Sequence, residues 1–169
     1  HTAVVWCMQV SNETGAIPPV GALNKLARRK SPNVRIHVDG VQGFMRVPMH
    51  MERMGVDLYA LSGHKIHGPK GIGVLAVRPG VRLIPQITGG GQEKGLRPGT
   101  EARRNIAAFA RAGEIRMARF DEDYAYVAAL AAYLREQVAA SLPDAAFNGA
   151  GDIPHVVNLS LPGCKSEVM

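Results

Sequence analysis

Short apolar segments that alternate with polar turns and helical stretches constrain the fold of this 169-residue chain more than any other feature. In order, the pattern predicts a strand over 2–10, a helix over 18–30, a strand over 34–38, a brief helical stretch over 49–54, a strand over 57–61 and a strand over 73–77. This order is typical of α/β proteins, in which right-handed crossovers join parallel strands. We therefore expect an α/β fold with a mostly parallel sheet flanked by helices.

The second half of the sequence is predicted to be mainly helical. A helix is expected from residue 100 or 101 to about 118, a second helix from about 122 to 140, and a strand over 155–161. The change of pattern near residue 118 predicts two parts. Residues 1–118 would form part of a large domain, and residues 119–169 a linking helix with the beginning of a second, smaller domain.

Composition excludes several classes of function. Hydrophobic residues make up 46% of the chain, too many for a disordered protein, and no apolar run approaches the roughly 18 residues that span a membrane. The net charge of +6 comes from dispersed basic residues without interleaved aromatic ones, so no nucleic-acid partner is expected. Cys7 and Cys164 form neither a disulfide framework nor a metal motif. Both are expected to be buried small hydrophobic residues in a reducing compartment.

The two ends of the sequence lead us to expect that the chain belongs to a longer protein. His1 runs directly into an apolar segment without a methionine or a polar lead. The last residues, 166–169, stop where a new helical or strand pattern begins.

Polar residues follow three of the predicted strands. In open parallel sheets, ligands bind beyond the carboxyl ends of the strands. The predicted order brings Asn12, Asp39 and residues 62–65 to that edge. We therefore expect polar groups that lie more than fifty positions apart in the sequence to meet in one crevice.

Lys65 is the strongest candidate for chemistry in this set. It follows a strand directly, within the small-residue turn Ser62-Gly63-His64-Lys65. Burial or neighbouring cations would lower the pKa of its amine and make it a nucleophile toward an aldehyde. Ser62, His64 and the backbone N–H groups of the turn are suited to holding a phosphate. A nucleotide-binding P-loop is the obvious rival, but its GxxxxGK[ST] spacing is absent.

Asp39 ends a predicted strand 26 residues before Lys65. A carboxylate beside the ring nitrogen of a pyridine-type cofactor keeps that nitrogen protonated, so that the ring can accept electrons from a substrate carbanion. Gln42, three residues later, is placed to donate a hydrogen bond to a phenolic oxygen on such a ring. The alternative role for Asp39 is that of a helix N-cap.

Taken together, these segments resemble the cysteine desulfurases, which belong to the class V aminotransferase group of fold-type I pyridoxal-phosphate (PLP) enzymes. Four motifs occur in the family's order and span nearly the whole chain. They are Ser11-Asn12-Glu13-Thr14-Gly15, the run from His37 to Gln42, the run from Ser62 to Gly73, and the run from Gly89 to Thr100. Departures from the family pattern are Ser11 in place of its first Asn, Gly40 where Ala is usual, and His67 where an aromatic residue is common.

The resemblance implies a fold and a set of roles. Residues 1–118 would be part of the fold-type I large domain, and residues 119–169 would begin the small C-terminal α+β domain. The catalytic residues would be Lys65, which binds the cofactor covalently and moves protons at the substrate α-carbon, and His64. The full set of cofactor-binding residues implied is Asn12, Asp39, Gln42, Ser62, His64, Lys65 and Thr100, with Thr100 reaching the phosphate from the neighbouring subunit of a homodimer. Asn12 and Thr100 have plainer alternatives, a turn residue and a helix N-cap.

The resemblance also implies an activity. The parent enzyme would convert L-cysteine to L-alanine with pyridoxal 5'-phosphate and keep the sulfur as a protein persulfide. In the cytoplasm, the sulfur would pass to an acceptor protein, either an iron–sulfur scaffold or a tRNA-thiolation enzyme. The catalytic cysteine loop, the substrate-binding arginine and the ring-stacking residue of the family lie outside residues 1–169. Cys164 precedes that loop and is not expected to be the nucleophile, so the isolated chain is expected to be inactive.

Two other classes of function stay open from the sequence. The parent protein would share Lys65 and Asp39 if it were another class V PLP enzyme, such as a selenocysteine lyase or an aminotransferase. A sulfur-pathway scaffold without catalysis is the second alternative. The joint presence of Lys65, Asp39 and His64 argues against that scaffold.

Overall fold

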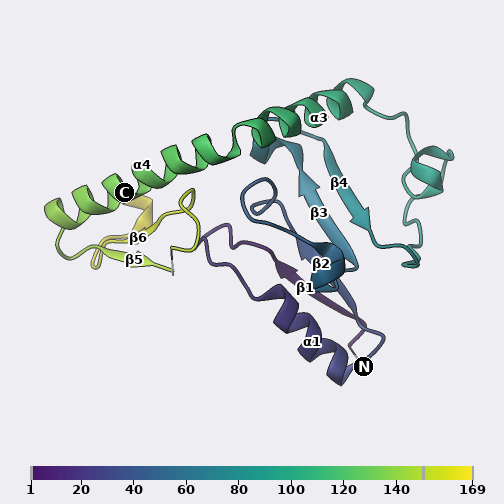
Figure 1. The fold of residues 1–169 in the computed structure, drawn as a ribbon, viewed down its shortest axis with the longest axis horizontal. Coiled ribbons are helices and arrows are strands. Elements are labelled where there is room, and N and C mark those ends of the chain that lie inside the picture. Colours follow the sequence, from purple (N-terminus) through teal and green to yellow (C-terminus); the bar gives the residue numbers. More distant parts are fainter. Residues whose placement is uncertain (1, 150, 169) are drawn as a thin grey trace.

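A four-stranded sheet with helices beside it forms one end of the molecule, and two long helices lead from it to a separate two-stranded sheet (Figure 1). The computed structural model describes residues 2–149 and 151–168. Its elements, with η for 3-10 helices, are β1 (Val4–Met8), α1 (Val20–Lys30), β2 (Arg35–Asp39), α2 (Met51–Met54), β3 (Leu58–Ser62), η1 (Gly63–Ile66), β4 (Gly73–Val77), η2 (Gln92–Gly95), α3 (Arg103–Ala118), α4 (Phe120–Ser141), β5 (Ala146–Asn148), β6 (Asn158–Ser160) and η3 (Ser166–Val168).

The larger sheet has the strand order β1-β2-β3-β4. β1 runs parallel to β2, β2 runs parallel to β3, and β4 is antiparallel to β3. The predicted α/β fold with a mostly parallel sheet is therefore confirmed. In register, Met8 lies beside Asp39, and Asp39 lies beside Ala60. The carboxyl ends of the first three strands consequently lie along one edge of the sheet (Figure 1).

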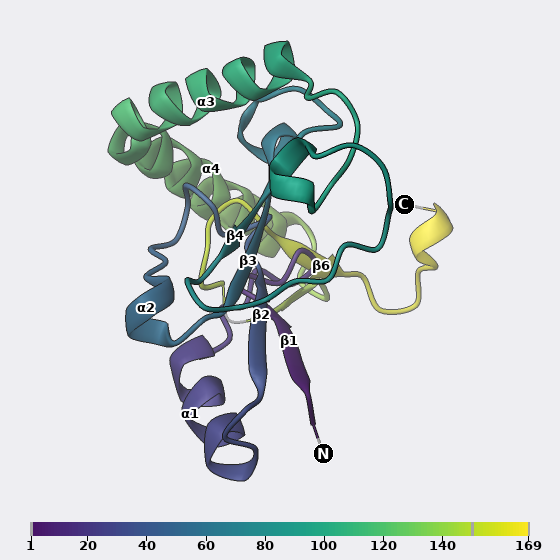
Figure 2. The ribbon, with the colours of Figure 1, turned by 90° about the vertical axis from the view of Figure 1, so that its right-hand side faces the viewer.

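The hydrophobic core lies on one face of this sheet, under α1 and α2 (Figure 2). Alternate residues of a strand point to opposite faces, so Ile36 and Val38 of β2 face the helices. Both are at most 2% exposed, and Val20 of α1 packs against them at 5%. Trp6 of β1 belongs to the opposite face and is 56% exposed. Asp39 has the same strand parity as the residues of β2 that turn away from the core.

A buried carboxylate joins the start of β3 to the elements around it. Asp57 is fully buried, and its Oδ2 accepts hydrogen bonds from the backbone N–H of Ile36 and from Arg28, both at 2.8 Å. Arg78 forms an ion pair with Oδ1 at 2.5 Å. Arg28, near the end of α1, reaches inward to a charge that burial would otherwise make costly.

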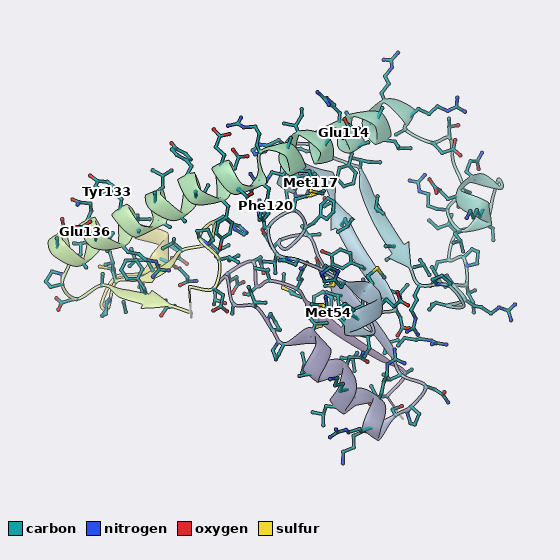
Figure 3. The ribbon with its side chains drawn as sticks, in the orientation of Figure 1. Met54, Glu114, Met117, Phe120, Tyr133 and Glu136 are labelled. Carbon is teal, nitrogen blue, oxygen red and sulfur yellow. The ribbon has the colours of Figure 1, made fainter. Side chains whose placement is uncertain are left out.

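Helix α3 crosses the sheet edge and continues almost directly into α4. Phe109, the buried residue of α3, makes an edge-on contact with Phe44. Only Arg119, which has non-helical dihedrals, separates the two helices, and Met117 and Phe120 flank this break (Figure 3). The break falls at the boundary predicted near residue 118. The division into two domains stays a prediction.

The C-terminal part differs in detail from the expectation. β6 is shorter than the predicted strand over 155–161, and β5, with which it pairs antiparallel, was not predicted. Cys164 is exposed in a turn after β6, so its predicted burial in a strand is wrong. Cys7 lies in a strand as expected but is half-buried, and this burial raises the pKa of its thiol. Within residues 2–149 and 151–168, no helix has the length and apolar character that crossing a membrane requires.

Candidate active site

Asp39 is the last residue of β2 and lies at the carboxyl edge of the sheet. Its Oδ1 accepts a hydrogen bond from the backbone N–H of Val41 at 2.9 Å, which fixes the carboxylate over the turn that follows. Among the described residues, no hydrogen bond engages Oδ2. The helix N-cap role considered for Asp39 is wrong, because a turn and not a helix follows it. Asp39 caps this turn with one oxygen, and the other oxygen is available to a ligand.

The turn after Asp39 packs against Tyr59 of β3. A Cβ atom added to Gly40 would lie only 2.0 Å from the Tyr59 ring, which explains why glycine stands at this position. The Tyr59 hydroxyl donates a hydrogen bond to Oε1 of the buried Gln9, and the Nε2 of Gln9 donates to the carbonyl of Val47. Burial and the nearby charge of Asp39 raise the pKa of the Tyr59 hydroxyl, so it stays a proton donor. Sequence reasoning missed this buried pair beneath the turn.

The second group of site residues follows β3. Ser62 ends the strand, and its Oγ lies 2.6 Å from Nδ1 of His64 in η1. Gly63 between them is buried, and a Cβ there would lie 2.9 Å from Ile72 and 3.3 Å from Phe109. The turn is therefore held closely between Ile72, the residue before β4, and α3. The structure brings Ser62 and His64 together as a hydroxyl–imidazole pair.

Lys65 occupies the middle of η1 and is half-buried. In the described part of the chain, its side chain makes no hydrogen bond and no ion pair. η1 ends at Ile66, and the next residue, His67, has a left-handed backbone (φ 65°) that terminates the helix. The lysine amine is thus not engaged by another protein group.

Arg46 connects the two turns. Its Nη1 lies 3.2 Å from both the carbonyl oxygen and the side-chain Oε1 of Gln42, and its Nη2 donates to the carbonyl of Lys65 at 2.8 Å. Gln42 and Lys65 are therefore joined through one guanidinium. Sequence reasoning missed this residue, because no motif considered there assigns a role to an arginine four positions after Gln42.

Asn12 and Thr100 are less closely connected to these residues. Asn12 is exposed in the turn after β1, where Ser11 Oγ accepts backbone N–H groups of Glu13 and Thr14. Thr100 is exposed in the loop between η2 and α3. The structure does not bring Thr100 into contact with the other candidates. Its alternative role as a helix N-cap is wrong, because the N-cap position of α3 is occupied by Ala102.

The loop between β5 and β6 reaches the same edge of the sheet. Asp152 accepts the backbone N–H of Ile17 at 2.9 Å, and the Asn158 amide donates to the carbonyl of Glu13 at 3.1 Å. His155 in this loop lies close to the backbone of Gln42. Burial, together with the charges of Arg46 and Arg116, lowers the pKa of His155 to about 4. This histidine, read from sequence as structural, is therefore neutral near pH 7.

Two surface hollows border the sheet without including Lys65 or Asp39. One of about 300 Å³ lies between α1 and the loop over 47–49, and one of about 600 Å³ lies along α3 and the start of α4. The expectation of a crevice is met only in part. The strand ends share an edge, but their polar groups do not line either hollow.

The donor set at this edge fits pyridoxal phosphate. An amine (Lys65) suits an aldehyde, a carboxylate (Asp39) suits a pyridinium, an amide (Gln42) suits a phenolic oxygen, and the paired Ser62 and His64 suit a phosphate. The uncommitted Asp39 Oδ2 and Lys65 amine leave the two groups that such a cofactor needs most free to bind it. Across the described residues, no group of three His, Cys, Asp or Glu side chains could hold a metal ion.

Comparisons with known proteins agree with this fit. The aminotransferase class-V family model matches residues 1–169. Cysteine desulfurase IscS of Rickettsia typhi is 39% identical over 171 residues, which cover 99% of this chain and 41% of the relative. The solved NifS-like protein of Rickettsia africae superposes with a TM-score of 0.91 at 28% identity, over 99% of this chain and 46% of that one. DndA of Streptomyces lividans gives a TM-score of 0.84 at 35% identity, over 98% of this chain and 48% of that one. The chain thus spans less than half the length of these proteins, and its fold is theirs.

Proposed function

The chain belongs to the aminotransferase class-V family, and we propose that it forms the central part of a PLP-dependent cysteine desulfurase. One observation carries the proposal. β2 and β3 are parallel neighbours, and they end in Asp39 and in the turn that carries Lys65. A carboxylate and an amine therefore leave adjacent strands at the same edge of the sheet.

When bound, pyridoxal phosphate supplies an electron-accepting ring that stabilises negative charge at the substrate α-carbon. Asp39 would hold a proton on the ring nitrogen through its carboxylate. Gln42 would donate its amide N–H to the phenolic oxygen. Ser62 and His64 would bind the phosphate, together with backbone N–H groups of η1.

Lys65 has two tasks in this proposal. Its amine would hold the cofactor at the aldehyde carbon, and the same amine would remove and return the proton at the substrate α-carbon. Both tasks need a lysine whose backbone is held in place and whose side-chain amine makes no bond to another protein group. The half-buried Lys65, with its carbonyl held by Arg46 and its amine without a protein partner among the described residues, meets this need.

The remaining assignments rest on the family. We propose L-cysteine as the substrate, a homodimer in which Thr100 contacts the phosphate of the neighbouring subunit, a cytoplasmic location, and a separate protein that accepts the sulfur. Asn12, at the carboxyl end of β1, would lie near the ring and the substrate carboxylate. The chain spans 41% of the Rickettsia typhi relative, and the sulfur-carrying cysteine would come from the part outside residues 1–169.

The test is replacement of Lys65 in the complete protein. Wild type purified with the cofactor should show a visible absorption band, and borohydride should fix the cofactor to the chain. Lys65→Ala should lose both signals, whereas Lys70→Ala, which changes an exposed lysine of the same loop, should keep them. Borohydride fixation that persists in Lys65→Ala would refute the assignment.

The isolated 169-residue chain provides a separate test of the expectation that residues 1–169 bind the cofactor but do not complete the reaction. Because it lacks the family's cysteine loop, it should not convert L-cysteine to L-alanine and sulfide. Turnover by this chain alone, measured as alanine formed, would show that the expectation is wrong.

A further inference from the structure

We propose that Arg46 is a positioning residue, which holds the Gln42 amide and the Lys65 backbone in a fixed relation at the cofactor edge. The inference rests on the proposed function and deepens it. Its basis is the contact of one guanidinium with both turns, at 3.2 Å to Gln42 and 2.8 Å to Lys65.

The first part of the argument concerns the Lys65 carbonyl. The last carbonyl groups of a helix have no partner within the helix, and η1 is only four residues long. Arg46 Nη2 supplies the missing donor to the Lys65 oxygen. This contact fixes the peptide plane that follows Lys65, and with it the direction in which the lysine side chain leaves the backbone.

The second part concerns the Gln42 amide. A guanidinium has only donors, so its contact with the side chain of Gln42 selects the amide oxygen. The Nε2 group must then point away from Arg46, and it offers its N–H bonds to an acceptor elsewhere. A phenolic oxygen is such an acceptor. Arg46 thereby determines which end of the amide faces the cofactor.

The third part concerns the setting of Arg46 itself. It is half-buried, and no carboxylate of the described residues lies within ion-pair distance. Burial and the charge of Arg116 lower the pKa of Arg46, but a guanidinium stays protonated in proteins. A half-buried guanidinium whose partners are two carbonyls and one amide oxygen is suited to holding backbone and amide in place. An ion-pair role would require an acidic partner.

The experiment compares Arg46→Met, Arg46→Lys and the control Arg111→Met in the complete protein. Arg111 is an exposed arginine of α3, paired with Glu114 at 2.8 Å. The first readout is hydrogen exchange of residues 62–68 in cofactor-free protein, where loss of one charged hydrogen bond should speed exchange by about tenfold in Arg46→Met. The second readout is the pH midpoint of the visible cofactor band, which should shift. Arg46→Lys keeps the positive charge but lacks the two guanidinium nitrogens that contact Gln42 and Lys65. Its exchange rate and pH midpoint should therefore lie between those of Arg46→Met and wild type.

A double substitution tests the route through the amide. If Arg46 acts on the band through Gln42, Arg46→Met should shift the midpoint less in a Gln42→Leu background than in wild type. Equal shifts in the two backgrounds would overturn that route. The whole inference would be overturned if Arg46→Met matched Arg111→Met both in the hydrogen-exchange rate of residues 62–68 and in the pH midpoint of the cofactor band.

The two hypotheses can fail separately. A wild-type protein without a visible band would refute the proposed function, while hydrogen exchange would still test the hold of Arg46 on η1. If Arg46→Met does not fold, the same exchange measurement on Arg46→Lys and Arg46→Gln decides, because both should exchange faster than Arg111→Met at residues 62–68.

Discussion

The Ser62 hydroxyl and the His64 imidazole lie 2.6 Å apart in one turn at the carboxyl end of β3. Ser62 is the last residue of β3, and His64 lies in η1, which follows it directly. We expect Ser62→Ala to weaken cofactor binding by about tenfold, because one hydrogen bond to a charged phosphate is lost. Fluorescence titration of cofactor-free protein measures this, with Ser160→Ala, an exposed serine of β6, as the control. Unchanged affinity in Ser62→Ala would exclude the hydroxyl from phosphate binding.

Asp39→Ala should impair turnover far more than cofactor docking. Without the carboxylate, the ring nitrogen loses its proton and the ring accepts electrons poorly, whereas the phosphate contacts remain. We expect a fall in kcat of about a hundredfold or more, the scale at which a group acting in the transition state contributes. Comparison of kcat with cofactor affinity provides the check, and Asp144→Ala, at an exposed aspartate, is the control. A variant with wild-type kcat would count against the pyridinium role.

Asp57 should be the most sensitive charged position for stability. Asp57→Ala leaves Arg28 and Arg78 without their buried partner, and the free energy of unfolding should fall by about 3 to 5 kcal/mol. Glu114→Ala breaks the exposed pair with Arg111 and should cost less than about 1 kcal/mol. Urea unfolding of the complete protein measures both. Similar losses in the two variants would show that burial of Asp57 has little energetic effect.

Gly40→Ala should destabilise the protein, since the added Cβ would lie 2.0 Å from the Tyr59 ring. Overpacking of this kind costs about 1 to 3 kcal/mol. A smaller side chain at position 59 removes the collision, so Gly40→Ala should cost less in a Tyr59→Leu background. Thermal unfolding of the four proteins gives the coupling between the two positions. Additive effects would mean that the backbone yields instead of the ring.

His155 should make stability depend on pH in mildly acidic solution. Its pKa is lowered to about 4 in the folded chain from an ordinary 6.5, so the unfolded chain binds more protons between these values. Stability from this residue is therefore complete above pH 6.5 and is lost as the pH falls toward 4. His155→Gln should flatten that part of the profile in urea unfolding, whereas His50→Gln, at an exposed histidine, should not. An unchanged slope in His155→Gln would contradict the prediction.

The order of elements could be predicted from the sequence because each strand is a short apolar run bounded by turn residues, a signal that is local in the sequence. The strand predicted over 73–77 agrees with β4, and the strand predicted over 57–61 lies one residue before β3. β5 escaped prediction because Ala146–Asn148 is too short to show a period. Helix α3 begins later than expected, at Arg103, because glycine and proline keep the preceding loop irregular.

The candidate site was only partly visible in the sequence. Asp39 and Lys65 could be proposed because each follows a strand within a turn of small residues. Arg46 and His155 could not, because their roles depend on contacts with Gln42 from a turn and from a distant loop. Local pattern carries no information on which carbonyl a guanidinium will reach. The burial of Asp57 was hidden for the same reason, since its arginine partners come from separate segments.

The register of β2 against β3 has a consequence for how the chain can change over time. Asp39 is opposite Ala60, so the separation of the two strand ends is fixed by the spacing of about 4.8 Å between hydrogen-bonded strands. The length of the crossover between β2 and β3 does not affect this distance. An extra residue next to the exposed His50 would be absorbed within the crossover, whereas one inserted between Tyr59 and Ser62 would turn every following side chain to the opposite face. The crossover between β2 and β3 can therefore change in length during evolution. The backbone hydrogen bonds between the two strands keep the distance between their carboxyl ends constant.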